Sequence, residues 1–460
     1  MLLIGVDGFE WNVILPMVER GELPTIAAMM EEGNFGALST MKPTLSPIIW
    51  TTIATGRPME DHGILGFSKE VPLAERRPNM TVQDVELYDN SDRKTKAIWN
   101  IASDAGKKVG VIGWWMTYPA EPINGLMVSQ TNANEDLQIQ YGTKIWKGGF
   151  RPNTPGQVYP EAIEPRIVRQ ADEVGETLEA DLEAIFGSFP HPLSPLGQRL
   201  WDNTRWSFKS DATYLRIALD AMQDSGEPYD LMCVYLGGPD VAGHRFWRYY
   251  EPEVFDDKPG PTEMDNLGDV IEDYYRWTDT ALGQLREAAG PDARVLIVAD
   301  HGMHAVNQQN RFDPDEIPMY VNSGHHMTAP PGVFLAAGPD LVDGPTTDAT
   351  SVRRAELANA GSVFDVAGTV LTLLNLPIGQ NFQGGIHKSA IEPTFLERFP
   401  AASVPTHDDQ AFLDGRKSLE TLAGGLDTTA VLQRLGELGY LGEHGAEEQA
   451  REGGNAPDGQ

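Results

Sequence analysis

Three short acidic motifs, far apart along the chain, each follow a run of apolar residues. They are Asp7 after Leu2–Val6, Asp240 with His244 after Leu231–Tyr235, and Asp300-His301 after Val295–Ala299. An apolar run that ends in a carboxylate is typical of a buried parallel strand, and open α/β sheets bind ligands at the carboxyl ends of such strands. Carboxylate oxygens and imidazole nitrogens together are metal ligands. The three motifs therefore predict a site for two metal ions and a metal-dependent hydrolase.

Each acidic motif taken alone has a second interpretation. Asp7 could be a helix N-cap or a turn aspartate. The acid and the histidine of the second motif are four residues apart, so they share a face only in a helix, and they could also form a surface pair. The adjacent Asp300 and His301 point apart unless the backbone turns, which Gly302 is expected to allow, and they could instead form a buried hydrogen bond.

A pair of adjacent histidines, His325 and His326, precedes a strand expected at 332–337. Neighbouring histidines cannot both easily face one metal ion, so we expect one to be a ligand and the other its neighbour. The residue pattern does not choose between them.

Ser46-Pro47 opens a segment that is expected to be helical up to Thr55 and to end at Gly56. Serine at the N-cap followed by proline is a favoured helix start, so Ser46 could act as a cap alone. The same place suits a nucleophile, because the N–H groups and dipole of a helix start favour a bound phosphate. A metal ion on the hydroxyl would also lower its pKa.

Strand-like and helix-like segments alternate along most of the chain, which predicts βαβ units and a mostly parallel sheet in an α/β protein. We expect one catalytic domain over residues 1–394. Its rhythm is interrupted at about 119–205 by an insertion that could cap the site or be a surface excursion. Residues 395–460 read as a peripheral C-terminal tail whose last residues, Gly445–Gln460, are acidic, rich in glycine and predicted to be disordered.

The composition is strongly acidic. Among 460 residues, 67 are Asp or Glu and 35 are Lys or Arg, which gives a net charge of −32. This argues against nucleic acid or an anionic membrane as a partner, because both need clustered cations. The single cysteine, Cys233, lies in an apolar run and is expected to be buried. With no apolar stretch near ~20 residues and no leader, we expect a cytoplasmic protein.

Taken together and in order, these motifs resemble the alkaline phosphatase superfamily, in particular its type I phosphodiesterase / nucleotide pyrophosphatase branch. The likeness spans about 1–118 and 229–390. The motifs that carry it are Gly5-Val6-Asp7-Gly8, Leu45-Ser46-Pro47 through Thr55-Gly56, Asp61-His62-Gly63-Ile64, Asp240 with His244, Ala299-Asp300-His301-Gly302-Met303, and Gly324 with His326. It implies an alkaline-phosphatase-like three-layer sandwich, with a central sheet between helices and a cap insertion.

The resemblance also implies roles for individual residues. The nucleophile of the family falls on Ser46. One metal ion would be bound by Asp7, Ser46, Asp300 and His301, and the other by Asp240, His244 and His326, which prefers His326 over His325. The implied cofactors are two divalent ions, Zn²⁺ by resemblance, with Mn²⁺ also suited to oxygen and nitrogen ligands.

Two positions depart from the specific patterns of relatives. Nucleotide pyrophosphatases carry a phosphoryl-binding Asn shortly after the His-Gly-Ile segment, where this chain has Phe67. Alkaline phosphatases place an Arg beside the nucleophile, where this chain has Pro47, and the segment at 46–50 also lacks the sulfatase pattern. We therefore expect a phosphodiesterase that forms a phosphoseryl intermediate on a small phosphate ester. The alternatives are a phosphomonoesterase and a phosphoryl or head-group transferase.

Four further residues could contact the substrate: Lys42, Trp114, Trp115 and Arg245. The tryptophans could line a pocket for the second group of a diester, or simply pack in the core. The two cations could hold phosphate oxygens, or remain exposed charges without a specific role.

Overall fold

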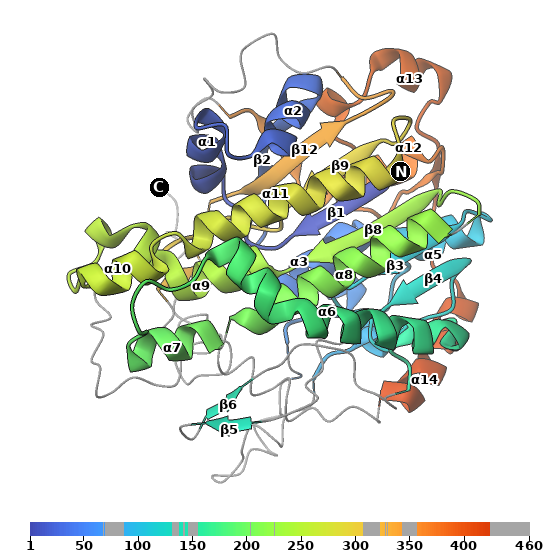
Figure 1. Ribbon diagram of the computed structural model, residues 1–460. Helices are drawn as coiled ribbons and strands as arrows, with labels where there is room; N and C mark the ends of the chain where they lie inside the picture. Colours follow the sequence, from blue (N-terminus) through green and yellow to red (C-terminus); the bar gives the residue numbers. More distant parts are fainter. Residues whose placement is uncertain are drawn as a thin grey trace, which may run out of the picture.

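A nine-stranded sheet runs through the centre of the protein (Figure 1). The computed structural model describes residues 1–67, 69, 87–130, 138–140, 143–145, 155–202, 204–224, 226–306, 323–326, 328, 330–342 and 357–423. In spatial order the strands are β13 (Asn359–Ser362), β2 (Asn34–Ser39), β12 (Gly332–Ala337), β9 (Val295–Val298), β1 (Leu2–Val6), β8 (Leu231–Leu236), β3 (Val109–Ile112), β4 (Gly125–Val128) and β7 (Val158–Tyr159).

Strand β1 lies in the middle of the sheet, between β9 and β8, and is parallel to both. Gly5 is aligned with Tyr235 of β8 and with Val298 of β9. All residues of β1, β8 and β9 are buried, which explains why these strands are continuous apolar runs. Strand β12 is antiparallel to both β9 and β2, and β7 is antiparallel to β4. The expected mostly parallel α/β sheet is confirmed.

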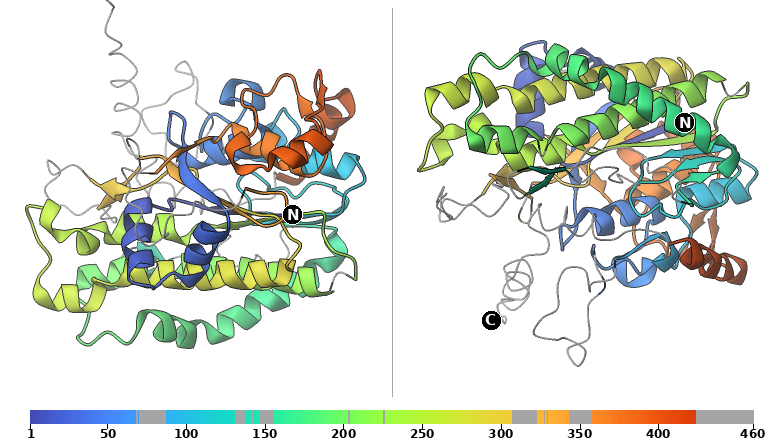
Figure 2. Two further views of the ribbon diagram at one scale, coloured as in Figure 1. Left: turned by 90° about the horizontal axis from the view of Figure 1, so that it is seen from above. Right: turned by 60° about the horizontal axis from the view of Figure 1, so that its bottom comes forward.

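Helices cover both faces of the sheet and make three layers (Figure 2). Alternate residues of β1 supply the two cores: Leu2, Ile4 and Val6 on one face, and Leu3 on the other. The first face carries α1 (Trp11–Glu19), α2 (Pro24–Glu32), α8 (Arg205–Asp224), α9 (Gly238–Tyr250) and α11 (Val270–Ala289). The second carries α3 (Ser46–Thr55), α5 (Ile98–Asp104) and α12 (Asp365–Leu373).

The expected insertion contains one long helix, α6 (Glu164–Phe186), which packs on α8 and α11 outside the first helical layer. Phe186 at its end contacts Trp201, Phe208 and Tyr274. Short elements complete this region: β5 (Gln138–Gln140), β6 (Thr143–Ile145) and α7 (Pro195–Asp202). Outside the insertion, α10 (Pro261–Leu267) lies between α9 and α11 in the chain. A capping role for the insertion stays a prediction, because much of 131–154 lies outside the described residues.

The start of the expected C-terminal tail is peripheral in position but firmly packed. It contains α13 (Pro393–Arg398), β15 (Ser403–Val404), which pairs with β14 (Ile378–Gly379), and α14 (Gln410–Ala423). Arg416 of α14 reaches inward to the buried Glu121, which also pairs with Arg93. This contact anchors the helix to the body of the protein. Residues 424–460, including the segment predicted to be disordered, lie outside the described residues.

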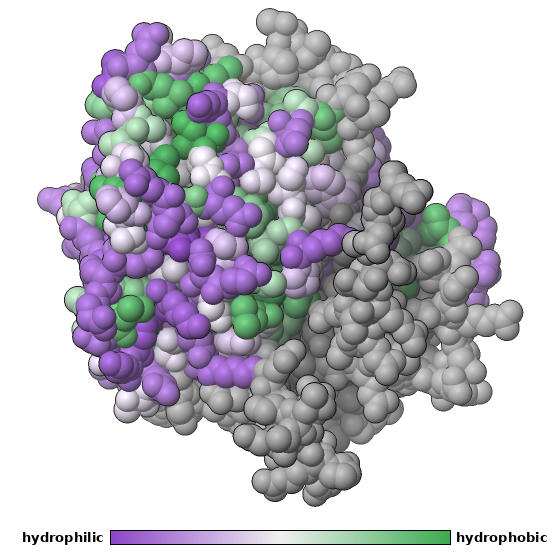
Figure 3. Space-filling view, turned by 180° about the vertical axis from the view of Figure 1, so that it is seen from behind, coloured by the Kyte–Doolittle hydropathy of each residue, from purple (hydrophilic) through white to green (hydrophobic). Residues whose placement is uncertain are grey.

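Among the described helices, none is both long enough and apolar enough to cross a lipid bilayer. The described part of the back face is mostly hydrophilic, with small apolar patches (Figure 3). Among the described residues, the exposed large apolar side chains are Leu65, Val254, Phe399 and Leu413.

Candidate active site

The three predicted carboxylates meet at the carboxyl ends of neighbouring strands. Asp7 directly follows β1, Asp240 lies in the first turn of α9 after β8, and Asp300 follows β9. Because β1 lies between the other two strands, Asp7 is the middle one of the three. Their exposed fractions are 2%, 6% and 0%, so all three acids are buried. Glycine permits this approach: Gly8 has φ +63°, and a Cβ there would lie 2.8 Å from Asp240 Cα.

A first group of potential metal ligands consists of Asp7, Asp300 and His301. His301 Nε2 lies 3.4 Å from Asp7 Oδ1 and 3.3 Å from Asp300 Oδ2. Adjacent residues of the chain thus face one point, as the sequence suggested. Gly302 has no left-handed backbone; instead, a Cβ there would lie 2.1 Å from Glu10 Oε2. Gly302 is therefore needed here because a side chain would collide with Glu10, and not because the backbone needs a left-handed turn.

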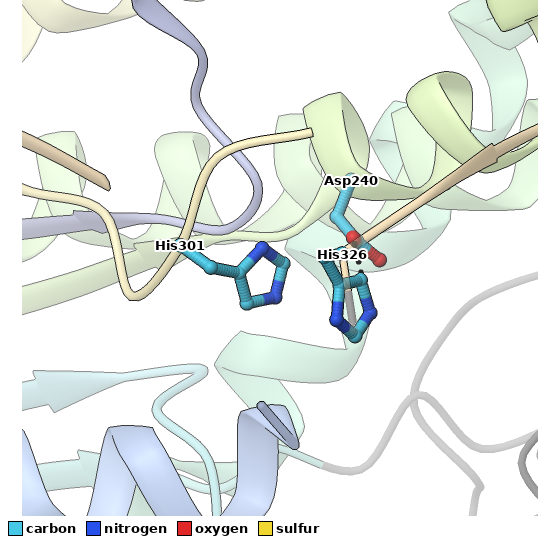
Figure 4. Close-up of side chains that lie close together, drawn as sticks. All are labelled: Asp240, His301 and His326. Atoms are coloured by element: carbon cyan, nitrogen blue, oxygen red, sulfur yellow. Dashed lines mark ion pairs between the residues drawn. The ribbon is translucent and has the colours of Figure 1, made fainter. Parts of the chain in front are cut away.

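A second group consists of Asp240, His301 and His326 (Figure 4). His326 Nε2 lies 4.0 Å from Asp240 Oδ1, and the rings of His301 and His326 are stacked with centroids 3.9 Å apart. His244 approaches the same carboxylate, with Nε2 3.4 Å from Asp240 Oδ1. The structure thus places His301 between two groups that the resemblance kept separate.

Backbone carbonyls orient the histidines of the site. His301 Nδ1 lies 3.1 Å from Gly302 O, and His244 Nδ1 lies 2.8 Å from Gly324 O. A ring whose Nδ1–H donates to a carbonyl presents an unprotonated Nε2 to the carboxylates, which is the usual state of a metal-binding histidine. Burial also lowers the pKa of all three histidines, to about 3 for His244 and well below its usual value for His326. They are neutral at physiological pH.

Ser46 lies at the first residue of α3, and its hydroxyl Oγ is 3.5 Å from Asp7 Oδ1. The N-cap of α3 is Leu45, and no side chain caps the helix. The capping interpretation of Ser46 is therefore wrong. A second Ser-Pro pair shows what capping would look like: Ser194 precedes α7, and its Oγ accepts the Gly197 N–H at 3.0 Å. The same dipeptide thus serves as a cap in one place and faces a carboxylate in the other.

The start of α3 has few N–H groups to offer a phosphate. Pro47 has none, and the N–H groups of Ile48 and Ile49 donate to Leu45 O. Of the N–H groups expected to bind a phosphate at the start of this helix, only that of Ser46 is left. A phosphate bound against Ser46 would need positive charge from another source.

The buried acids form a site where a source of positive charge could bind. Burial raises the pKa of Asp300 well above its usual value, and the neighbouring Asp7 and Asp240 carboxylates raise it further. Asp300 Oδ2 and His301 Nε2 are buried and make no hydrogen bond within the described part of the chain. A divalent cation would neutralise this charge and accept both lone pairs, so the donor set fits a metal ion.

Three residues beside Asp7 were not assigned to the metal site from the sequence. Asp7 Oδ2 accepts hydrogen bonds from Tyr235 OH at 2.6 Å, from Trp50 Nε1 at 3.0 Å and from Trp115 Nε1 at 3.3 Å. Burial, followed by the Asp7 carboxylate, raises the pKa of Tyr235 well above its usual value, so the phenol stays a donor. The position of Tyr235 could have been read from the alternation of β8, because it points to the same face as Leu231 and Cys233.

The residues predicted to contact substrate are found in different surroundings. Trp115 reaches Asp7, whereas Trp114 is fully buried against Trp50 and donates to Trp50 O at 3.2 Å. Lys42 is exposed, four residues before Ser46, and Arg245 is buried on α9 next to His244. None of these four substrate contacts is tested by the structure.

The other histidine of the adjacent pair is directed elsewhere. The ring of His325, on β11 (Gly324–His325), packs against that of His304, on β10 (His304–Ala305), with centroids 4.2 Å apart. His326 instead has a hydrogen bond with the backbone of Thr44, close to Ser46. The geometry thus brings His326, and not His325, to the acids.

One side of Ser46 is apolar. Leu45, Ile48 and Phe67 form a small buried cluster, and partly buried Met41, Met59, Leu87 and Trp115 pack against it. The rings of Phe67 and Trp115 meet edge to face with centroids 5.7 Å apart. A buried apolar cluster therefore lies directly beside the candidate nucleophile.

Comparisons with known proteins show the family and the fold. Residues 1–358 match a family model described as type I phosphodiesterase / nucleotide pyrophosphatase. A mutant of the alkaline phosphatase PafA has a similar structure, with TM-score 0.50, 14% identity, and coverage of 85% of this chain and 98% of its own. Human ectonucleotide pyrophosphatase / phosphodiesterase 5 is matched with TM-score 0.45, 14% identity, and coverage of 84% and 97%. No curated protein matches the chain. The likeness to PafA confirms the alkaline-phosphatase-like fold.

Proposed function

Because this chain belongs to the type I phosphodiesterase / nucleotide pyrophosphatase family, we propose that it hydrolyses a small phosphodiester with Ser46 as the nucleophile. Membership of the family makes the chain a phosphoester hydrolase; the diester preference and the phosphoseryl mechanism are the proposal. The observation that carries it is the meeting of three groups at one point. Ser46 Oγ and His301 Nε2 lie 3.5 Å and 3.4 Å from the same oxygen, Asp7 Oδ1.

We assign two divalent cations, Zn²⁺ or Mn²⁺, to the residues around this point. Asp7, Ser46, Asp300 and His301 would hold one, and Asp240, His244 and His326 the other. When bound, such ions supply positive charge for the attacking and leaving oxygens and lower the pKa of a hydroxyl. Asp300 Oδ2 and His301 Nε2, which make no hydrogen bond among the described residues, and the histidines oriented by backbone carbonyls support this assignment.

The protein residues would perform a double displacement. Ser46 Oγ attacks phosphorus in line with the leaving alcohol, which gives a phosphoseryl intermediate and the free alcohol. Water then attacks the phosphoserine from the side that the alcohol has left, and this step restores the Ser46 hydroxyl. Asp7, fixed at the end of β1, keeps the nucleophile in place during both steps.

The surroundings of Ser46 favour a diester over a monoester. A monoester brings a second negative charge, and the nucleophile has proline, not arginine, at the next position. The apolar cluster of Leu45, Ile48 and Phe67 suits the second, uncharged substituent of a diester. Phosphomonoesterase and transferase activities remain the alternatives, and each gives a distinct product.

The central test is Ser46→Ala. We expect turnover of bis(p-nitrophenyl) phosphate to fall by about three orders of magnitude or more, because the attacking group is lost. Two bound ions per chain should remain by atomic spectroscopy. Ser194→Ala is the matched control, since it changes the other Ser-Pro pair; it should lose about 1 kcal/mol of stability and keep its activity.

Substrate comparisons refine this test. Wild-type protein should prefer the nitrophenyl diester over p-nitrophenyl phosphate and nitrophenyl sulfate. Activity of Ser46→Ala equal to that of wild type would remove Ser46 from the mechanism. Transfer of the phosphoryl group to an added alcohol, in place of water, would favour the transferase alternative.

A further inference from the structure

One oxygen of Asp7 is surrounded by hydrogen-bond donors while the other faces the candidate metal ligands. Tyr235 OH and Trp50 Nε1 donate to Oδ2 at 2.6 and 3.0 Å, and Trp115 Nε1 lies 3.3 Å from it. Oδ1 faces Ser46 Oγ and His301 Nε2. The two oxygens of one carboxylate thus have different surroundings.

The donors form a connected and uncharged set. Trp115 Nε1 also donates to Tyr235 OH at 2.7 Å, so a chain of hydrogen bonds runs from Trp115 through Tyr235 to Asp7. Bonds in such a chain strengthen one another. Because indole and phenol groups carry no charge, they orient the carboxylate without neutralising it.

Aromatic packing holds these donors in place. The Trp50 ring meets the rings of Trp114 and Tyr235 edge to face, with centroids 5.1 and 5.3 Å apart. Trp50 is fully buried and lies four residues after Ser46, on the same face of α3. The helix that presents the nucleophile therefore also presents a donor to the carboxylate beside it.

These donors leave little capacity on Oδ2 for a metal ion. A carboxylate oxygen has two lone pairs, and Tyr235 and Trp50 use both, with Trp115 adding a shared contact. Oδ1 keeps its lone pairs directed toward Ser46 and His301. A cation at this site can therefore bind Asp7 through Oδ1 alone, and Asp7 cannot rotate to bind it with both oxygens.

We propose that Trp50, Trp115 and Tyr235 are positioning residues that make Asp7 a one-oxygen ligand of the ion beside Ser46. This inference rests on the proposed function, since it requires a metal ion at the Asp7 group. One-oxygen binding would leave the ion free to accept the Ser46 hydroxyl as well. Loss of a donor would let the carboxylate swing onto the ion with both oxygens and keep that hydroxyl from the ion.

The test compares Tyr235→Phe with wild type after removal and controlled return of metal. In Tyr235→Phe we expect one of two Zn²⁺ ions to bind about 10–100-fold more weakly, the usual effect of losing a group that orients a ligand. With Co²⁺ in place of Zn²⁺, visible absorption should weaken, because a second Asp7 oxygen raises the coordination number. For the nitrophenyl diester, kcat should fall more than KM changes.

Tyr249→Phe is the matched control. It also removes a buried hydroxyl, but Tyr249 OH has no hydrogen-bond partner within the described part of the chain. Its zinc affinity and cobalt spectrum should equal those of wild type. Trp115→Phe, at a half-buried position, is the second variant and should shift the cobalt spectrum in the same direction with a smaller loss of affinity.

The outcomes separate the two proposals. Wild-type zinc affinity and an unchanged cobalt spectrum in Tyr235→Phe would overturn the positioning role. If that variant fails to fold, as judged from its metal-free circular dichroism, the same unchanged readings in Trp115→Phe would overturn it. If wild-type protein itself binds no ion, the proposed function fails before the positioning role is reached.

Discussion

Two buried charged clusters in this protein are built in opposite ways. At the side of the sheet, Glu121 lies between the guanidinium groups of Arg93 and Arg416 and accepts the Trp99 indole N–H at 2.8 Å. At the carboxyl ends of the central strands, Asp7 and Asp300 have, among the described residues, only His301 as an ion-pair partner. Both clusters exclude water, with Glu121 1% exposed and Asp300 0%.

The pKa values show what this difference means. Burial raises the pKa of Glu121, but Arg93 and Arg416 more than offset this and lower it to about 2. Burial raises the pKa of Asp300 as well, and there the neighbouring acids raise it further. Equal burial with opposite neighbours therefore gives one cluster whose charges are paired within the chain and one that, in our proposal, a cation completes. The first stabilises the fold, and the second is suited to a reaction.

The largest expected effect is on the complete cluster. Glu121→Gln would leave two buried guanidinium groups without a counter-charge, and we expect the free energy of unfolding to fall by about 3–5 kcal/mol. Urea unfolding should show the same loss with and without a chelator, because no metal ion is involved. Glu420→Gln, on the exposed side of α14, is the control and should change stability little.

The pH dependence of that loss is set by the lowered pKa of Glu121. A group whose pKa falls on folding contributes stability above its unfolded pKa, near 4.5, and this contribution disappears as the pH falls through about 2. The difference between wild type and Glu121→Gln should therefore shrink between pH 4.5 and pH 2. A difference that stays constant over this range would contradict the charge pairing.

Metal removal should act on the other cluster. At a free metal concentration 100 times the dissociation constant, one bound ion adds about 2.7 kcal/mol to the free energy of unfolding. Chelation of wild-type protein should abolish this gain, as measured by urea unfolding before and after dialysis against chelator. Glu121→Gln should lose the same increment, because its own defect lies elsewhere. A free energy of unfolding that chelation does not change in either protein would contradict a metal-completed cluster.

The smallest expected effect is a gain in stability. Asp300→Asn removes a buried charge that no Lys or Arg pairs with among the described residues, and we expect the metal-free protein to become more stable by about 0.5–3 kcal/mol while metal binding is lost. Because folding raises the pKa of Asp300, wild type loses stability as the pH rises above about 4, so the gain should grow with pH. The measurement is urea unfolding in chelator at several pH values.

A matched variant checks that this gain is specific. Asp279 is also a buried aspartate, but its oxygens accept the Thr25 and Ile26 N–H groups at 3.1 and 2.8 Å. Asp279→Asn should therefore lower stability, because the amide replaces one of these acceptors with a donor. If both variants change stability in the same direction, the contrast between the clusters does not hold.

Much of the frame could be predicted from the sequence because it depends on local periodicity. The apolar runs that end at Asp7 and Asp300 indicated buried parallel strands, and the strand at 332–337 has the predicted bounds. Helix α1 was not predicted, because Pro16 within it obscures the pattern. The antiparallel direction of β12 was missed too, since a buried strand is equally apolar in either direction.

The candidate site shows the same division. The acids and histidines that the structure places together could be predicted from the order of the motifs, since each lies beside a recognisable apolar run. The placement of His301 between both acidic groups depends on side-chain torsions, which leave no trace in residue order. The docking of Arg416 against Glu121 joins residues 295 positions apart, and no local pattern indicates it.

The position of β1 between β9 and β8 has a consequence for how this enzyme can change. Hydrogen-bonded strands are spaced by about 4.8 Å, close to the roughly 3.5–4 Å between ions of two-metal centres. The hydrogen bonds between these strands thus fix the spacing of the backbone positions that carry the three acids, whatever side chains surround them. Loops and helices can change to suit new substrates. The spacing of the three acids stays constant as long as these three strands remain paired.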